Sequence, residues 1–228
     1  MKTIYLAVLG TALFMSACAD PAANKPKATT SAPSNAATAA AKTDVITASS
    51  SNVFDGFKAT GTELAIDTET SKVEFTGSKV TGKHDGGFKN FKGIIDLVGD
   101  KAETSRVLFE IDMASVFTDS DGLTKHLQTG DFFEVEKFPK SSFISGKIVP
   151  DTTKGANNFT VTGDLEMRGV KKSVTFPATI EVKPDGASVK AEFSINRKDF
   201  GIVYAGKADD LIRDDVVLRL DLKASKKK

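Results

Sequence analysis

Apolar and polar residues alternate with a period of two along most of the chain after about residue 58. In residues 159–167 the odd positions are apolar or glycine and the even positions are polar, as a strand with one buried face requires. The same alternation recurs over residues 73–75, 91–97, 107–113, 174–182, 189–196 and 216–223, and around residue 143. These segments predict about eight β-strands, each about ten residues long.

Turn-forming residues separate the predicted strands. Examples are Gly99-Asp100, Arg168-Gly169 and Pro184-Asp185-Gly186, which supply the positive-φ or proline-initiated corners that hairpins need. Consecutive hairpin-linked strands with one apolar face are typical of an up-and-down barrel, whose interior is either filled by side chains or holds one small ligand. A two-layer sandwich is the alternative, and the strand lengths favour the barrel.

One segment, residues 119–133, interrupts the alternation. Asp119 or Ser120 is followed by Leu123 and Leu127 at helical spacing, and Gly130 comes soon after. This pattern predicts a short capped helix closed by Gly130. We expect the helix to cover one mouth of the barrel.

The first 18 residues predict export and attachment of a lipid. A basic start and an apolar run over residues 4–15 form a signal peptide, too short to span a bilayer comfortably. Residues 15–18 resemble the bacterial lipobox, which implies cleavage before Cys18 and lipid modification of that cysteine. Because Ala19 follows, the pattern resembles lipoproteins of the outer membrane of diderm bacteria, facing the periplasm. An ordinary signal peptide with an incidental cysteine is the alternative.

Residues 19–57 are predicted to be a disordered linker. The segment is rich in Ala, Ser and Thr, and large apolar side chains are too few to offset the entropy of ordering it. Pro21, Pro26 and Pro33 argue against a helix. The predicted organisation is therefore a signal peptide over 1–18, a linker over 19–57 and one barrel domain over 58–225.

The amino-acid composition excludes several classes of function and site. The chain has 31 basic and 30 acidic residues, which leaves no field to attract nucleic acid. A single Cys excludes an internal disulfide and a Cys-based zinc site. Sixteen Phe stand beside two Tyr and no Trp. Because Phe carries no polar group, this excess indicates a purely apolar interior or an apolar ligand site.

Three motifs resemble the YceI-like family. They are HLQTGDFFEVEKFP at 126–139, followed by Phe143, VTGDLEMRGV at 161–170 and INRKDFGI at 195–202. The resemblance implies a lipocalin-like antiparallel β-barrel around a long apolar cavity. It also implies binding of a lipid or polyisoprenoid in the bacterial envelope. The predicted fold class is thus all-β, an eight-stranded lipocalin-like antiparallel barrel with one short helix.

Apolar residues on the regular strands and near the interruptions are candidates for contact with that lipid. A buried alkyl or isoprenoid chain gains about 0.8 kcal/mol per CH₂ and needs no polar partner. The same rings could instead fill a barrel core. The lipid-binding candidates are Phe75, Phe88, Phe91, Leu123, His126, Leu127, Phe132, Phe133, Phe143, Phe193 and Phe200.

Polar residues offer little catalytic or metal chemistry. His84 and His126 lack a nearby acidic cluster at ligand spacing, so no metal site is predicted. The mixed-sign runs Arg197–Asp199 and Asp209–Asp215 are interpreted as solvated clusters, with one Arg facing a lipid phosphate or a quinone carbonyl as the alternative. The sequence contains no Gly-x-Ser-x-Gly elbow, phosphate loop or dinucleotide fingerprint. We therefore predict a protein that is not an enzyme, with an enzyme using His126 as a minor alternative.

These observations support one main hypothesis. The chain binds or carries an amphiphilic long-chain lipid, a polyisoprenoid or isoprenoid quinone, and needs no cofactor beyond that lipid. Its expected partners are the apolar ligand and the membrane, through Cys18, with no nucleic acid; a homodimer stays open. The alternative is an envelope interaction or structural module whose core is filled and whose loops bind a protein.

Overall fold

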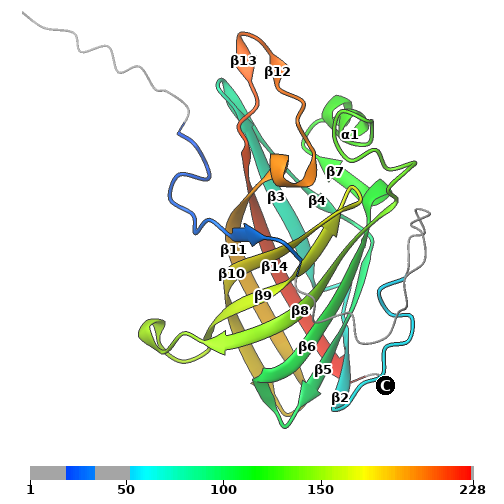
Figure 1. The fold of residues 1–228 in the computed structure, drawn as a ribbon, viewed down its shortest axis with the longest axis vertical. Coiled ribbons are helices and arrows are strands. Elements are labelled where there is room, and N and C mark those ends of the chain that lie inside the picture. Colours follow the sequence, from blue (N-terminus) through cyan, green and yellow to red (C-terminus); the bar gives the residue numbers. More distant parts are fainter. Residues whose placement is uncertain (1–18, 34–51, 227–228) are drawn as a thin grey trace, which may run out of the picture.

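The computed structural model describes residues 19–33 and 52–226, which form a barrel of long antiparallel strands (Figure 1). The predicted signal peptide with Cys18 and the middle of the predicted linker lie outside the described residues. The strands are β1 (Thr29–Ser31), β2 (Thr62–Ile66), β3 (Lys72–Lys79), β4 (Gly82–Phe88), β5 (Phe91–Val98), β6 (Lys101–Asp112), β7 (Val116–Thr118), β8 (Lys140–Pro150), β9 (Asn158–Met167), β10 (Val170–Lys183), β11 (Gly186–Asn196), β12 (Gly206–Lys207), β13 (Asp210–Leu211) and β14 (Asp215–Lys226).

Eight of the described strands close into a ring. Its order is β10, β9, β8, β6, β5, β2, β14 and β11, and β11 pairs again with β10. Four of the eight neighbouring pairs in the ring, β5–β6, β8–β9, β9–β10 and β10–β11, are hairpins along the chain, as the turn residues predict. The prediction of an eight-stranded antiparallel barrel is confirmed, and the sandwich alternative is wrong.

Three further strands extend the wall at one end of the barrel. β14 pairs with β2 through residues 224–226 and with β3 through residues 217–221. From β3 the sheet continues to β4 and β7. The order is therefore not a simple up-and-down succession, because β3 and β4 follow β2 in sequence but lie beyond β14 in the sheet, and β2 pairs directly with β5. Alternation identifies strands but does not say which strands pair.

The alternation places apolar side chains inside the barrel. On β11, Ala191, Phe193 and Ile195 are buried, whereas Lys190 and Glu192 are exposed. β10 repeats this pattern with Val174, Phe176, Ala178 and Ile180. The interior wall is consequently a continuous apolar surface.

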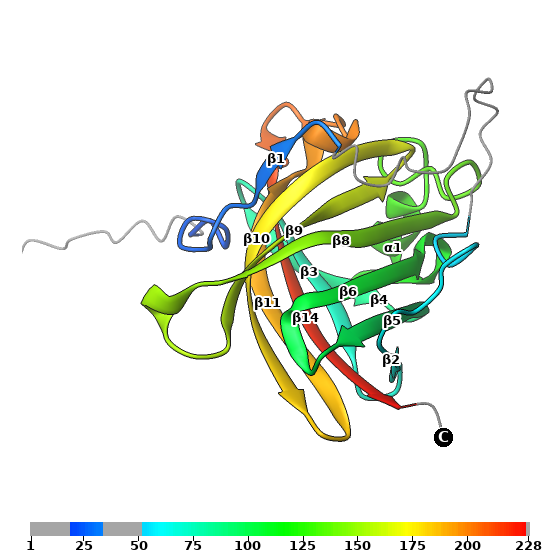
Figure 2. The ribbon, with the colours of Figure 1, turned by 60° about the horizontal axis from the view of Figure 1, so that its bottom comes forward.

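Residues 19–33 correct the prediction of a linker that is disordered throughout. β1 pairs with Ser173–Thr175 of β10, as Figure 2 shows. On the other side, the Ala28 amide donates to the Ser194 carbonyl and the Ser194 amide donates to the Pro26 carbonyl, both at 2.8 Å. β10 and β11 pair directly only over 179–183 and 186–190, so this segment fills the gap where they diverge. The amino-acid composition does not indicate this ordered segment, because backbone hydrogen bonds and not apolar side chains join it to β10 and β11.

Residues 52–57, also assigned to the linker, likewise contact the barrel. The Lys92 ammonium lies 4.8 Å from the centroid of the Phe54 ring, and the Arg106 guanidinium lies 5.2 Å from that of Phe57. These are cation–π distances, in which the face of each ring attracts the charge. The folded unit therefore includes residues before the predicted boundary at 58.

The predicted helix is α1 (Asp121–Leu127), and its N-terminus is capped as expected. The Leu123 amide donates to the Ser120 hydroxyl at 3.4 Å, and Leu127 is buried. The helix ends at Leu127 rather than at Gly130, because the Thr129 amide and hydroxyl both bind the His126 carbonyl and satisfy the last turn. Short 3₁₀ turns are present at η2 (Met113–Ser115), η3 (Thr152–Lys154) and η4 (Arg197–Phe200). No helix in the described ranges is long and apolar enough to cross a membrane.

The carboxylate of Asp96 on β5 is completely buried. It holds in place Thr60 and Gly61, the two residues that precede β2. It accepts hydrogen bonds from the Gly61 amide at 2.7 Å, the Thr60 amide at 3.1 Å and the Thr60 hydroxyl at 3.0 Å. Arg106 adds a charge 3.8 Å away. Burial raises the pKa of Asp96, but these hydrogen bonds outweigh it and hold the pKa below its usual value.

We expect Asp96→Asn to destabilise the barrel by about 1–3 kcal/mol at pH 7, since Asn accepts through only one of its two terminal atoms. A depressed pKa stabilises the fold above the unfolded value of about 3.9 and loses this effect as pH falls below it. The difference between wild type and variant should therefore shrink in acid. Urea unfolding at pH 7 and at successively lower pH measures the free energy of unfolding of both proteins. A difference that does not change with pH would contradict the role of the charge.

A candidate ligand cavity in the barrel

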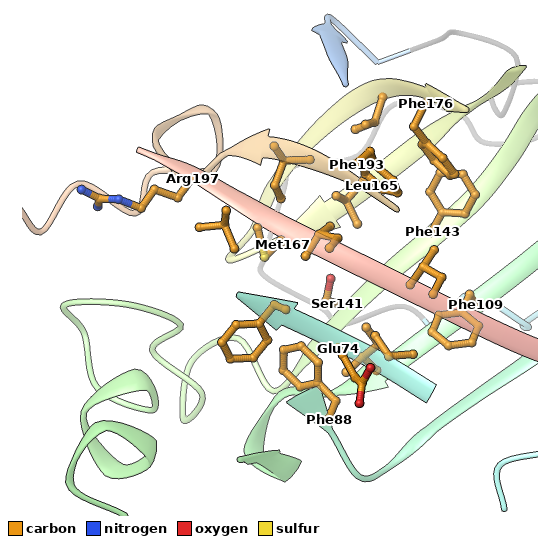
Figure 3. Close-up of a pocket in the computed structure, with 18 of the residues that line it drawn as sticks. Glu74, Phe88, Phe109, Ser141, Phe143, Leu165, Met167, Phe176, Phe193 and Arg197 are labelled. Atoms are coloured by element: carbon orange, nitrogen blue, oxygen red, sulfur yellow. The ribbon is translucent and has the colours of Figure 1, made fainter. Parts of the chain in front are cut away.

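The barrel encloses a cavity of about 430 Å³ with almost entirely apolar walls. Figure 3 shows Phe143, Phe176, Phe193 and Leu165 on one side of this space and Phe88 and Phe109 on the other. They come from different strands of the ring, because each strand presents every second side chain to the lumen. The volume lies within the range of about 300–1,000 Å³ usual for small-molecule sites.

Eight of the eleven residues predicted to contact a ligand line this cavity. These residues are Phe75, Phe88, Leu123, Leu127, Phe132, Phe133, Phe143 and Phe193. Leu123 and Leu127 come from α1, which lies at one end of the barrel as expected (Figure 1). The segment that interrupts the alternation thus contributes to the cavity wall.

Three predicted residues do not line the cavity. Phe91 packs against Phe109, with ring centroids 5.5 Å apart, within the hydrophobic core. Phe200 is completely buried in the core because η4 turns the chain after β11. His126 is separated from the cavity by Phe132, against whose ring it packs, and its Nε2 is 2.8 Å from Asp131 Oδ2.

The cavity is also lined by residues that are not among the predicted candidates. Phe109 and Phe176 line the space, together with Leu165 and Met167 at the centre of Figure 3. Phe176 stacks on Phe193 with centroids 4.2 Å apart and an interplanar angle of 11°. All four residues occupy inward positions of regular strands, so the period-two pattern alone contained the signal.

Glycines in the strands let aromatic rings lie against the wall. A Cβ at Gly93 would overlap the Phe109 ring, and a Cβ at Gly163 would overlap the Phe143 ring. Each ring therefore occupies the place where a neighbouring side chain would otherwise stand. Rings packed in this way leave the centre of the lumen open.

Two of the charged or titratable side chains of the lining, Lys79 and His84, lie on the hairpin of β3 and β4, whereas Glu74 and Ser141 lie further along the cavity (Figure 3). Lys79 forms an ion pair with Asp210, and His84 Nδ1 lies 2.7 Å from Asp119 Oδ1. The side chains of Lys79 and His84 are 39% and 40% exposed, so the cavity reaches solvent here. At the opposite end the lining residues Ile95, Ile148 and Leu222 are buried. The cavity thus has a polar, open mouth and an apolar, closed base.

Arg197 corrects the interpretation of residues 197–199 as a solvated cluster. It is buried, and its Nε, Nη1 and Nη2 donate to the carbonyls of Arg213, Ile202 and Ile212 at 3.0, 2.7 and 3.3 Å. Burial lowers the pKa of Arg197, and the charge of Asp214 opposes that shift. Figure 3 shows the guanidinium directed away from the lumen, so it holds the chain at the mouth.

Solved structures share this barrel. BcnA of Burkholderia cenocepacia matches with a TM-score of 0.62 and 24% identity, over 70% of this chain and 99% of that one. A polyisoprenoid-binding domain of Saccharophagus degradans gives a TM-score of 0.59 at 17% identity, over 72% and 98% of the two chains. A YceI protein of Campylobacter jejuni gives 0.56 at 26% identity, over 63% and 85%.

Sequence comparison agrees with the three motifs. A UPF0312 protein of Pseudomonas putida is 34% identical over 137 residues, which are 58% of this chain and 70% of that protein. A second, from Pseudomonas fluorescens, is 33% identical over 139 residues. The model of the YceI-like domain matches residues 64–224, from β2 to near the end of β14. The chain belongs to the YceI-like family.

Proposed function

We propose that the protein binds an amphiphilic lipid with a long apolar tail, a polyisoprenoid or isoprenoid quinone, without changing it chemically. The observation that carries the proposal is the apolar cavity, closed at its base and open at a polar mouth. An apolar tail gains about 0.8 kcal/mol per CH₂ that it buries there. The polyisoprenoid-binding domain of Saccharophagus degradans, which shares the fold, supports this class of ligand.

The two ends of the cavity suit the two ends of such a molecule. The base, lined by Ile95, Ile148 and Leu222, offers no polar partner and matches a hydrocarbon tail. The mouth brings Lys79 and His84 close to the position that a polar head group would occupy. The ligand would therefore enter tail first.

We further propose that the protein acts in the bacterial envelope, anchored through a lipid on Cys18. The support is the sequence over residues 1–18, a signal peptide that ends in a lipobox. In a diderm bacterium the anchored barrel would face the periplasm from the outer membrane. A purely structural module would instead have a filled core, and the cavity favours the binding function.

The test is to purify the chain from cell membranes and extract it with organic solvent. Mass spectrometry should identify an isoprenoid-type lipid at about one molecule per chain, as a single cavity of this size requires. Recovery of no lipid, or of bulk phospholipid alone, would overturn the proposal. The mass of the intact chain measures separately whether Cys18 carries a lipid.

A further inference from the structure

Exposed apolar side chains gather at the mouth of the cavity. In the described part of the chain, the large apolar residues left exposed are Val80, Phe117, Val149, Val203 and Leu211. Val80, Val203 and Leu211, with exposed fractions of 55%, 64% and 49%, belong to the two segments that frame the mouth. Single exposed apolar residues need no explanation, but a cluster beside a cavity indicates a binding surface. We refer to these three residues as the rim.

The two rim segments form one unit. The Val80 amide donates to the Leu211 carbonyl at 3.2 Å, which joins the turn between β3 and β4 to the hairpin of β12 and β13. The Thr81 hydroxyl binds Asp210 at 3.0 Å, and Lys79 forms an ion pair with the same carboxylate. Figure 1 shows both hairpins projecting together beyond the end of the barrel that carries α1. Val80 and Leu211 are thus held side by side at the tip.

The N-terminal segment begins at the same end. Asp20 Oδ2 lies 3.3 Å from Nη1 of Arg213, which immediately follows the rim hairpin. Lys27 is paired with Asp215 at 2.8 Å, and β1 fixes the segment to β10. Cys18 precedes Asp20 by two residues, a span of at most about 7 Å even when fully extended. A lipid on Cys18 would therefore start close to the mouth and not at the far end of a long tether.

We infer that the rim is a membrane-docking surface, which rests on the bilayer with the mouth of the cavity facing the lipid. The inference rests on the proposed function, since the lipid on Cys18 brings the rim to the membrane. Charges beside the rim balance: Lys79 is paired with Asp210 and Arg213 with Asp20, and the same hairpin carries one more charge of each sign, Lys207 and Asp209. The rim therefore binds by insertion of apolar side chains rather than by attraction to anionic lipids.

Docking in this orientation affects how the bound lipid enters and leaves the cavity. A lipid tail could pass from the bilayer into the cavity without crossing water. Exposure of the tail to water costs about 0.8 kcal/mol for each CH₂, so a direct route removes most of the barrier to exchange. The rim thus governs the rate of lipid exchange, while the cavity governs the affinity.

Tryptophan fluorescence tests the orientation, because the chain contains no Trp. Leu211→Trp places the reporter on the rim, and Val149→Trp places a matched reporter at an exposed position of β8 away from the mouth. Each chain is reconstituted into phosphatidylcholine vesicles with acyl chains brominated or not. We expect bromine to quench the rim reporter about twofold, since inserted interfacial residues reach the acyl boundary, and to leave the control unchanged. Equal emission of both reporters in the two kinds of vesicle would overturn the inference.

A second variant separates docking from ligand binding. Val80→Asn/Leu211→Asn should slow the uptake of a fluorescent isoprenoid lipid from phosphatidylcholine vesicles about tenfold, the effect of losing partial burial of two apolar side chains. The amount bound at equilibrium should stay that of wild type, because neither residue lines the cavity. Unchanged uptake would count against docking. If wild type binds no isoprenoid lipid, the proposed function fails, while the quenching result still decides the orientation.

Discussion

Leu165→Trp is expected to lower the amount of lipid that co-purifies with the barrel about tenfold. Leu165 lies on β9 and projects into the middle of the cavity, between Phe143 and Met167 (Figure 3). An indole there fills space that the lipid tail would otherwise occupy. Displacing about two CH₂ groups costs the ligand roughly 1.6 kcal/mol, which corresponds to slightly more than a tenfold loss of affinity.

The variant should remain folded, because the added volume enters open space rather than a packed core. Thr179→Trp is the matched control, since Thr179 is exposed on the outer face of β10. Solvent extraction with mass spectrometry, together with urea unfolding of both variants, measures the effect. Lipid retained equally by the two variants would show that the tail does not use this part of the cavity.

The regular strands were the most predictable part of the site. Phe75, Phe143 and Phe193 occupy inward positions of long strands, and period-two alternation is enough to place them in the lumen. The same alternation also places Phe109 and Phe176 in the lumen, although neither is among the predicted candidates. The alternation on β11 also continues from Phe193 and Ile195 to Arg197, so the burial of this arginine could have been predicted.

Other features could not be derived from the pattern of side chains. β1 belongs to a segment rich in Ala, Ser and Thr, and it is held by backbone hydrogen bonds to β10 and β11. Whether such a ladder forms depends on an unfilled gap between two distant strands, which composition does not report. His126 and Phe200 depend in turn on the directions in which α1 and η4 leave the sheet. Those directions are set by tertiary packing and not by local periodicity.

Arg197→Ala is expected to lower the free energy of unfolding by about 2–5 kcal/mol, the other large effect that the structure predicts. The guanidinium supplies donors to the carbonyls of Ile202, Ile212 and Arg213, and alanine leaves these carbonyls without them. Chemical unfolding measures the loss. Hydrogen exchange should rise most over residues 202–213, since these carbonyls hold the hairpin at the mouth.

Two further variants show which property of Arg197 matters. Lys198→Ala removes an exposed charge paired with Asp214 at 2.9 Å and should change stability by at most about 0.5 kcal/mol. Arg197→Lys keeps the charge but loses the planar fork that reaches several carbonyls, so most of the loss should persist. Full recovery in the lysine variant would assign the effect to the charge of Asp214 instead. Because Ile202 and Ile212 line the cavity, a loosened hairpin should also release bound lipid faster, which links stability at the mouth to retention of the ligand.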